Sequence, residues 1–152
     1  MTPIKFSVRL FSKTVPVKLF ERVLDLDNWQ TFSGFGPIPA IEKAEFENDQ
    51  GTILGRRIAV TNSDGSTHME EVRSWEPPEF IEMELKDFSP PLSTLATHFR
   101  ERWLFEAVAK GTVVVRSFEL YPKHWFTRPV LWLTGQFLKH AVEKHTQQIM
   151  SD

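Results

Sequence analysis

The sequence predicts an α+β fold in which a curved antiparallel sheet packs against one long C-terminal helix. Apolar residues alternate with a period of two in residues 4–12 and through most of residues 41–120, as they do in half-buried strands. Hairpin-length turns separate the predicted strands, and short turns make neighbouring strands antiparallel. Residues 126–150 have helical apolar spacing and form the only long amphipathic element, so this helix is expected to cover one sheet face.

The N-terminal part is predicted to contain one strand and two short helices. The strand covers residues 4–12. Pro16 suits the first turn of a helix, Thr14 is the expected N-cap, and apolar residues recur at helical spacing through residues 17–26. A second short helix is expected to carry Trp29 and Phe32 and to end at Ser33-Gly34, before a stiff loop rich in Pro and Gly.

The middle of the chain is predicted to form six strands, at residues 41–47, 52–61, 67–75, 80–87, 98–105 and 112–120. Turns are predicted at residues 48–51, at Asp64-Gly65 and at Pro77-Pro78, and a loop at residues 89–92. In the final helix Gly135 costs about 1 kcal/mol relative to Ala, so we expect a packing reason for it.

Length and charge narrow the class of protein. The 152 residues fit one domain covering residues 1–152, since domains commonly have about 100–200 residues. The 18 Lys and Arg residues against 20 Asp and Glu residues give a formal charge of −2. This balance argues against a nucleic-acid partner, which requires a net basic face. No run approaches the roughly 20 apolar residues of a membrane span, so no integral membrane segment is expected.

The absence of cysteine excludes several kinds of site. A disulfide framework, a thiolate nucleophile, an iron–sulfur cluster and Cys-ligated zinc are all ruled out. The first six residues have no apolar region of the signal-peptide kind, and a cytoplasmic location is the expectation. No dinucleotide fingerprint, phosphate loop or nucleophile elbow is present, so neither a cofactor nor a catalytic motif is predicted.

Aromatic residues make up 12% of the chain, with 13 Phe and 5 Trp but only 1 Tyr. Tyr has a hydroxyl group that needs a hydrogen-bond partner when buried, whereas Phe has none. This composition therefore indicates a large dry interior, and both a solid core and an apolar cavity fit it.

Three segments carry a resemblance to a known family. Residues 16–32, "PVKLFERVLDLDNWQTF", resemble the first helices of the polyketide cyclase/dehydrase-like branch of the START/Bet v 1 superfamily. Residues 72–80, "VRSWEPPEF", resemble its strand–Pro-Pro–strand turn, and residues 103–115, "WLFEAVAKGTVVV", its Trp-x-Phe strand with the following Gly-Thr turn and strand. The order and spacing of these segments cover nearly the whole chain. The resemblance implies the helix-grip fold, with a cavity for an apolar ligand between the sheet and the long helix.

Two carboxylates occupy positions that strand parity places toward the interior. Glu70 and Glu71 point to opposite faces of their predicted strand, and leaving Glu71 in water costs less free energy, so Glu70 is expected to point inward. Glu101 lies on the same face of its predicted strand as several aromatic residues. Arg116 has the matching parity on the next strand and is the expected partner of Glu101. A polar anchor for a ligand head group and a general acid or base with a raised pKa both fit this pattern. A structural ion pair or a solvated strand face fits it as well.

With the resemblance, these carboxylates and part of the aromatic set become candidate ligand-binding residues. The set consists of Trp29, Phe32, Phe35, Glu70, Met83, Phe99, Glu101, Trp103, Phe118, Trp132 and Phe137. Loops near Phe35 and Pro90-Pro91 are expected to gate the cavity.

The five histidines are interpreted as surface or rim residues. His140 and His145 are five residues apart on a helix, whereas a zinc-binding helix places its two histidines four apart. His68 lies close to two glutamates but would need ligands from elsewhere, so no metal site is predicted. In an enzyme, His98 is a possible helper of the cavity carboxylates.

Residues 120–128 combine Trp and Phe with basic residues. A transient membrane-contact edge, a ligand gate and a loop that caps the core all fit this composition.

The favoured hypothesis is a binding or carrier protein for a small hydrophobic molecule such as a lipid, quinone, polyketide or other aromatic compound. The first alternative is an enzyme of the cyclase, dehydratase or hydrolase kind that uses Glu70 or Glu101 as acid or base. The second alternative is an interaction module with a filled core. A monomer and a homodimer are both compatible with the sequence.

Overall fold

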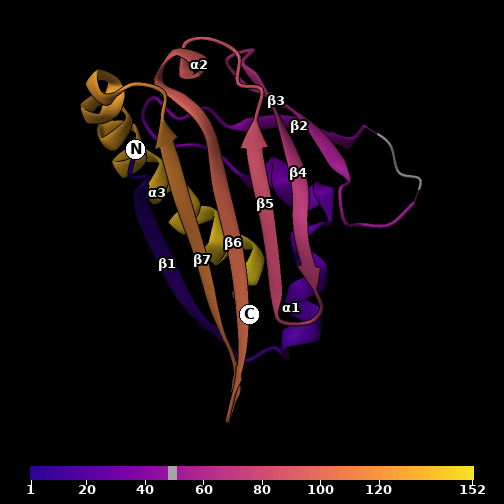
Figure 1. The fold of residues 1–152 in the computed structure, drawn as a ribbon. Coiled ribbons are helices and arrows are strands. Elements are labelled where there is room, and N and C mark those ends of the chain that lie inside the picture. The colour runs from indigo at the N-terminus through magenta and orange to yellow at the C-terminus, as the bar shows by residue number, and fades with distance from the viewer. Residues whose placement is uncertain (48–50) are drawn as a thin grey trace.

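The computed structural model describes residues 1–47 and 51–152, so the predicted turn at residues 48–51 lies outside the described residues except for Gly51. The chain begins with a strand and two short helical elements, continues mainly as strands and ends in a long helix (Figure 1). The elements are β1 (Ile4–Ser12), α1 (Pro16–Val23), the 3-10 helix η1 (Leu26–Thr31), β2 (Ile41–Phe46), β3 (Arg57–Asn62), β4 (Thr67–Glu76), β5 (Phe80–Lys86), α2 (Leu92–Leu95), β6 (Ala96–Val108), β7 (Gly111–Pro122), the 3-10 helix η2 (Trp125–Thr127) and α3 (Arg128–Met150).

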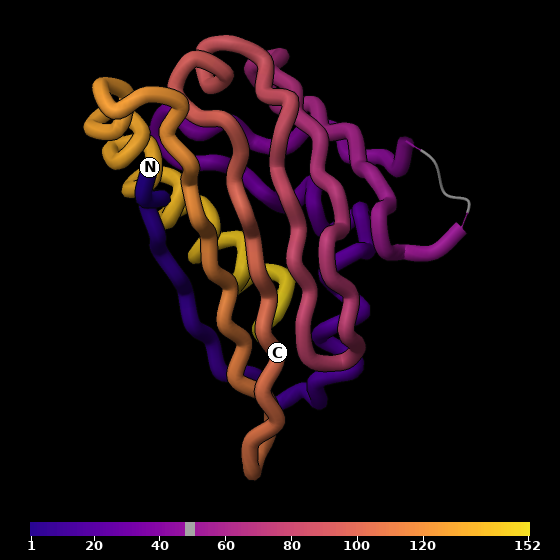
Figure 2. The backbone as a smooth tube through the Cα atoms, in the orientation of Figure 1, coloured from indigo at the N-terminus to yellow at the C-terminus, as the bar shows by residue number. Residues whose placement is uncertain are grey.

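The strands form one seven-stranded sheet in the order β1-β7-β6-β5-β4-β3-β2. Every neighbouring pair is antiparallel, and β1 pairs with β7, so that the first and last strands of the chain lie side by side. The sheet curves around α3, which lies with α1 and η1 on one of its sides (Figure 2). The predicted α+β helix-grip architecture is therefore confirmed. Within the described residues no helix is both long and apolar enough to cross a membrane.

The core consists of two groups of buried side chains on the inner face of the sheet. One group surrounds α1 and the end of α3, and includes Leu19, Trp103 and Met150. The other lies under the first half of α3 and includes Phe99 and Leu131. Strict alternation of inner and outer residues along β5 and β7 supplies the sheet side of both groups. Each fully buried side chain of this size contributes about 1.5–3 kcal/mol.

Gly135 has the packing role that its position in α3 predicts. A Cβ atom on Gly135 would lie 3.1 Å from Cδ1 of Leu120 on β7 and 3.8 Å from Cγ2 of Ile4 on β1. The glycine thus lets the helix backbone approach the sheet closely at this point.

Several predicted boundaries are wrong. The second short helix ends at Thr31, so Phe32 lies outside it, and β6 runs from Ala96 to Val108 rather than over residues 98–105. The strand predicted from residue 52 begins only at Arg57, because Gly51 and Gly55 adopt positive φ angles of 86° and 84° that interrupt an extended chain. The N-cap of α1 is Val15 rather than Thr14, whose hydroxyl group instead donates to Asp152. The predicted loop at residues 89–92 leads into the short helix α2.

Candidate functional site

A cavity of about 290 Å³ lies between the inner face of the sheet and α3. Ligand pockets commonly measure about 300–1,000 Å³, and an engineered cavity of about 150 Å³ already holds benzene. The wall is mostly apolar and takes side chains from both core groups. It is formed by Val23, Trp29, Phe32, Pro37, Ile38, Pro39, Ile41, Asn62, Asp64, Ser66, His68, Glu70, Met83, Leu85, Phe88, Ser89, Pro91, Leu92, Leu95, Phe99, Glu101, Trp103, Arg116, Phe118, Thr134, Leu138, Val142, His145 and Ile149.

Three loops surround one end of the cavity. They are the loop before β2, the β3–β4 turn and the segment that leads into α2, and they contribute Ile38, Ser66 and Pro91 among others. The segments expected to gate the cavity therefore do line it, although Phe35 itself does not. Rigid Pro residues in two of these loops limit how far the surrounding backbone can move.

Five ionisable side chains on the strands and on α3 form a polar strip across the mostly apolar wall, apart from Asp64 in the β3–β4 turn. They are His68 and Glu70 on β4, Glu101 on β6, Arg116 on β7 and His145 on α3. The four residues on strands occupy positions whose side chains point to the inner face of the sheet, as predicted for Glu70 and Glu101. Glu101 is 3% exposed and Arg116 is 7% exposed. Charges this deeply buried are stable only with close partners.

Arg116 is held by three neighbours. Its Nε donates to Oε2 of Glu101 at 2.5 Å, and its Nη1 donates to Nδ1 of His145 at 2.9 Å and to Oγ1 of Thr146 at 3.3 Å. Its guanidinium group also lies over the Trp103 ring, 4.3 Å from the ring centroid. This arrangement fixes the guanidinium plane and joins β7 to β6 and α3.

His145 is neutral in this arrangement. Its Nε2 lies 2.9 Å from the carbonyl oxygen of Asn28, which can only accept, so Nε2 carries the hydrogen and Nδ1 accepts from Arg116. Burial, together with the positive charge of Arg116, lowers the pKa of His145 to about 3. His145 therefore connects α3 to η1 and does not act as a proton donor near neutral pH.

The carboxylates have different surroundings. Burial raises the pKa of Glu101, and the negative charge of Glu70 adds to this rise, whereas Arg116 opposes it. Glu70 accepts a hydrogen bond from Nε2 of His68 at 2.9 Å. Glu101 is thus paired with a guanidinium group and Glu70 with an imidazole, and the carboxylate oxygens have further lone pairs that can accept hydrogen bonds from a ligand.

Eight of the predicted site residues line the cavity: Trp29, Phe32, Glu70, Met83, Phe99, Glu101, Trp103 and Phe118. Phe35, Trp132 and Phe137 lie outside the wall, and their predicted placement is wrong. Trp132 is 53% exposed on the solvent face of α3. Phe35 stacks on His140 with ring centroids 4.8 Å apart, and Phe137 lies beside Phe35 rather than in the cavity.

The surface interpretation is wrong for His145 and fits His98, whose alternative role as a helper of the carboxylates is contradicted. His145 is buried in the polar strip, not at the surface. His98 lies on the outer face of the sheet, stacked on Tyr121 with ring centroids 4.3 Å apart, so it cannot assist the cavity carboxylates.

The C-terminal helix was expected to contribute Trp132 and Phe137, but a different face of α3 lines the cavity. The helix presents Thr134, Leu138, Val142, His145 and Ile149 to the cavity. These residues recur at intervals of three or four, which is the helical signal that would have identified His145. Within residues 1–47 and 51–152, no three His, Asp or Glu side chains gather in a way that could hold a metal ion.

Solved structures share this architecture at low sequence identity. Ara h 8.0201 aligns with a TM-score of 0.63 at 17% identity, over 96% of this chain and 99% of its own. The di-domain aromatase/cyclase StfQ from the steffimycin biosynthetic pathway aligns with a TM-score of 0.73 at 14% identity, over 98% of this chain and 50% of its own. TTHA0849 from Thermus thermophilus aligns with a TM-score of 0.72 at 13% identity, over 97% of this chain and 94% of its own.

The fold and its enclosed cavity define a helix-grip protein of the START/Bet v 1 superfamily, as the sequence resemblance implied. Residues 3–151 match the family described as polyketide cyclase / dehydrase and lipid transport, and the chain belongs to that family. A comparison with curated proteins gave no match.

Proposed function

We propose that this protein binds a small, mostly apolar molecule in the cavity, with a hydrogen-bonding group of the ligand placed against the polar strip. The observation that carries the proposal is the cavity of about 290 Å³, whose apolar wall is interrupted by five ionisable residues that are hydrogen-bonded among themselves. Apolar contacts supply affinity, and a few fixed polar groups orient the ligand.

The charges of the strip favour one kind of ligand group. Arg116 gives its Nε and Nη1 hydrogens to Glu101, His145 and Thr146, and an anionic ligand group would also meet the carboxylates of Glu70 and Glu101 in the same strip. Glu70 accepts one hydrogen bond, from the His68 imidazole, lines the cavity, and as a carboxylate has further acceptor sites. A hydroxyl or amine on an aromatic or lipid-like skeleton fits this wall better than a carboxylate does.

The proposal is tested with the neutral fluorescent probe N-phenylnaphthylamine. Leu138 lines the cavity from α3, so Leu138→Trp should fill part of the space and reduce probe binding at least about tenfold, which corresponds to about 1.4 kcal/mol. Leu104→Trp is the matched control, because Leu104 is exposed on the outer face of β6. Equal probe binding by both variants, or none by the wild type, would contradict the proposal.

Native mass spectrometry of the protein purified from its own host would identify the ligand. A bound small molecule that is absent from the Leu138→Trp variant is the expected result.

A second candidate function is acid–base catalysis on the bound molecule. Two observations favour it: burial raises the pKa of Glu101, and the hydrogen-bonded pair of His68 and Glu70 faces the cavity. The masses of molecules recovered from the wild type and from Glu70→Gln separate the two functions. A catalyst would retain product in the wild type and unreacted precursor in the variant, whereas a binding protein would retain the same molecule in both.

The cytoplasmic location, the lack of a nucleic-acid partner and the monomeric or homodimeric state stay predictions from the sequence.

A further inference from the structure

We propose that the protein docks on the surface of an anionic lipid bilayer through an aromatic patch beside the cavity. The docking patch consists of Trp125, Phe126, Val130, Trp132 and Leu133, on η2 and the first turns of α3. Trp125 is 77% exposed, and each of the other four is more than half exposed. The docking itself does not depend on the proposed ligand.

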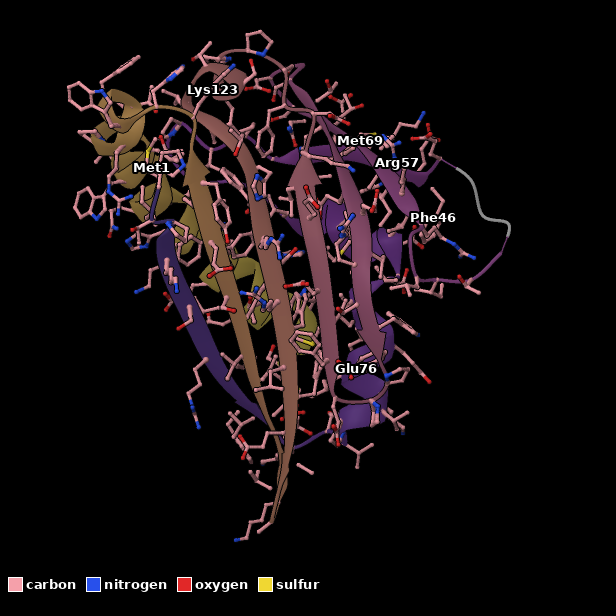
Figure 3. All side chains as sticks on the ribbon, viewed as in Figure 1. Met1, Phe46, Arg57, Met69, Glu76 and Lys123 are labelled. Carbon is pink, nitrogen blue, oxygen red and sulfur yellow. The ribbon has the colours of Figure 1, made fainter. Side chains whose placement is uncertain are left out.

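The first turns of α3 have an apolar face toward the solvent. Leu131 and Gly135 pack toward the sheet, whereas Val130, Trp132 and Leu133 point away from it. The start of α3 projects from one corner of the molecule, and its side chains extend away from the body (Figures 1 and 3). A projecting corner with exposed aromatic rings is suited to shallow insertion among lipid head groups.

The charge around the patch matches an anionic surface. Between Glu119 and Glu143 the sequence contains Lys123, Arg128 and Lys139 but no Asp or Glu, although the whole chain has a formal charge of −2. The segment that carries the exposed rings therefore has a net positive charge, because its three basic residues have no acidic neighbours in the sequence to offset them. Basic side chains beside exposed Trp and Phe are the combination that binds anionic lipid head groups while the rings enter the interface.

The docking patch is attached to one of the segments that line the cavity. The backbone N–H of Lys123 donates to the carbonyl oxygen of Leu95 at 2.9 Å, and Oγ1 of Thr127 donates to the same oxygen at 3.1 Å. Leu95 and Leu92, both on α2, belong to the cavity wall. Docking would therefore bring α2 close to the bilayer, where an apolar ligand could pass between the membrane and the cavity; this last step rests on the proposed function.

The test is vesicle flotation without added ligand. Vesicles of phosphatidylcholine alone are compared with vesicles of phosphatidylcholine mixed with phosphatidylglycerol. We expect binding to the mixed vesicles that weakens as salt is added, because the charges are exposed and screened. The double variant Trp125→Ala with Leu133→Ala should bind these vesicles at least about tenfold more weakly, since it removes two large apolar side chains from the contact.

The matched control is Phe11→Ala with Leu54→Ala, which removes two exposed apolar side chains outside the patch. Its binding should equal that of the wild type. A second variant, Lys123→Gln with Lys139→Gln, should reduce binding to the mixed vesicles and leave the weak binding to phosphatidylcholine unchanged. Circular dichroism of each variant checks that the fold is retained.

Three outcomes would overturn the proposal. The first is no binding of the wild type to mixed vesicles, and the second is an equal loss in the patch and control variants. The third is a wild-type dimer that the patch variant converts to a monomer with no change in vesicle binding, which would assign the patch to self-association. Probe binding in the cavity is measured separately, so failure of docking is distinguishable from failure of the proposed function.

Discussion

Arg116 on β7 and Glu101 on β6 form a buried ion pair in the cavity wall, with Nε and Oε2 2.5 Å apart. The two residues are diagonal neighbours on adjacent strands, since Glu101 is in register with Phe118 and Arg116 with Trp103. Because both side chains are deeply buried, each depends on the other for a compensating charge.

Replacing Arg116 by Met should therefore destabilise the protein by about 3–5 kcal/mol, because Glu101 would be left buried without a partner. The double variant Arg116→Met with Glu101→Gln should recover part of that loss. Urea unfolding of the wild type, the two single variants and the double variant gives the coupling free energy. Effects that add to within about 0.5 kcal/mol would show that the pair is not coupled.

The buried His145 should make stability depend on pH. The pKa of His145 falls from 6.5 to about 3 on folding, so below pH 6.5 the unfolded state binds a proton that the folded state rejects. Stability is therefore lost as the pH falls from about 6.5 toward 3, by up to about 1.4 kcal/mol per pH unit. Glu101, whose pKa is raised in the folded state, has the opposite effect as the pH rises above 4.5.

His145→Gln isolates the contribution of His145 to the pH dependence of stability, because an amide can donate to Asn28 and accept from Arg116 without titrating. The free energy of unfolding of this variant should fall less steeply below pH 6.5 than that of the wild type. His140→Gln is the control, since His140 is exposed on the same helix and should leave the pH profile unchanged. Identical profiles for the wild type and His145→Gln would refute the assignment.

The inward position of Glu70 was predictable because it depends on local alternation alone. The register shift in β4 lies between Val72 and Ser74, after Glu70, so the parity of Glu70 is preserved. Trp75 packs against the core beyond that bulge, next to Phe20, although simple alternation would place it on the outer face. The bulge arises from pairing with β5, which the sequence of β4 alone does not specify.

The cavity face of α3 was less predictable because the rotation of the helix is set by distant residues. Apolar residues occur on both sides of its first turns, so periodicity does not distinguish Trp132 and Phe137 from Leu138. The close approach of Gly135 to Leu120 fixes which side meets the sheet. That contact joins residues far apart in the chain. With the helix in this rotation, Trp132 points toward the solvent and His145 points toward the polar strip.

Asp152 is predicted to hold the segment after β1 to the end of α3. Its carboxylate accepts from the hydroxyl groups of Ser12 at 2.8 Å and Thr14 at 2.7 Å and from the backbone N–H of Lys13 at 2.7 Å. These hydrogen bonds lower the pKa of Asp152 to about 2. The stabilisation is therefore present above pH 3.8, the value expected when unfolded, and is lost as the pH falls toward 2.

Asp152→Asn should lower the melting temperature at neutral pH, and the difference from the wild type should disappear near pH 2. Differential scanning calorimetry at both pH values measures it. Glu143→Gln removes an exposed carboxylate from the same helix and should have a smaller effect at neutral pH. An Asp152→Asn variant as stable as the wild type at neutral pH would contradict the predicted role.

Gly34 is predicted to fix the loop before β2, which contributes Pro37, Ile38 and Pro39 to the cavity wall. Its φ angle is 74°, and a Cβ atom would lie 2.3 Å from the carbonyl oxygen of Ile38, a backbone atom that can move only with the loop. Gly34→Ala should therefore weaken binding of N-phenylnaphthylamine and destabilise the protein by more than the cost of its backbone angle alone, about 1–2 kcal/mol.

Gly55→Ala supplies that reference cost, because Gly55 has a similar φ angle of 84° but nothing within 4 Å of the added Cβ atom. We expect Gly55→Ala to lower the free energy of unfolding by the cost of its backbone angle only and to leave probe affinity unchanged, since neither of its neighbours in the sequence lines the cavity. The difference between the two variants in urea unfolding then measures the close approach of Gly34 to Ile38. Equal destabilisation together with equal probe affinity would mean that this approach does not shape the cavity wall.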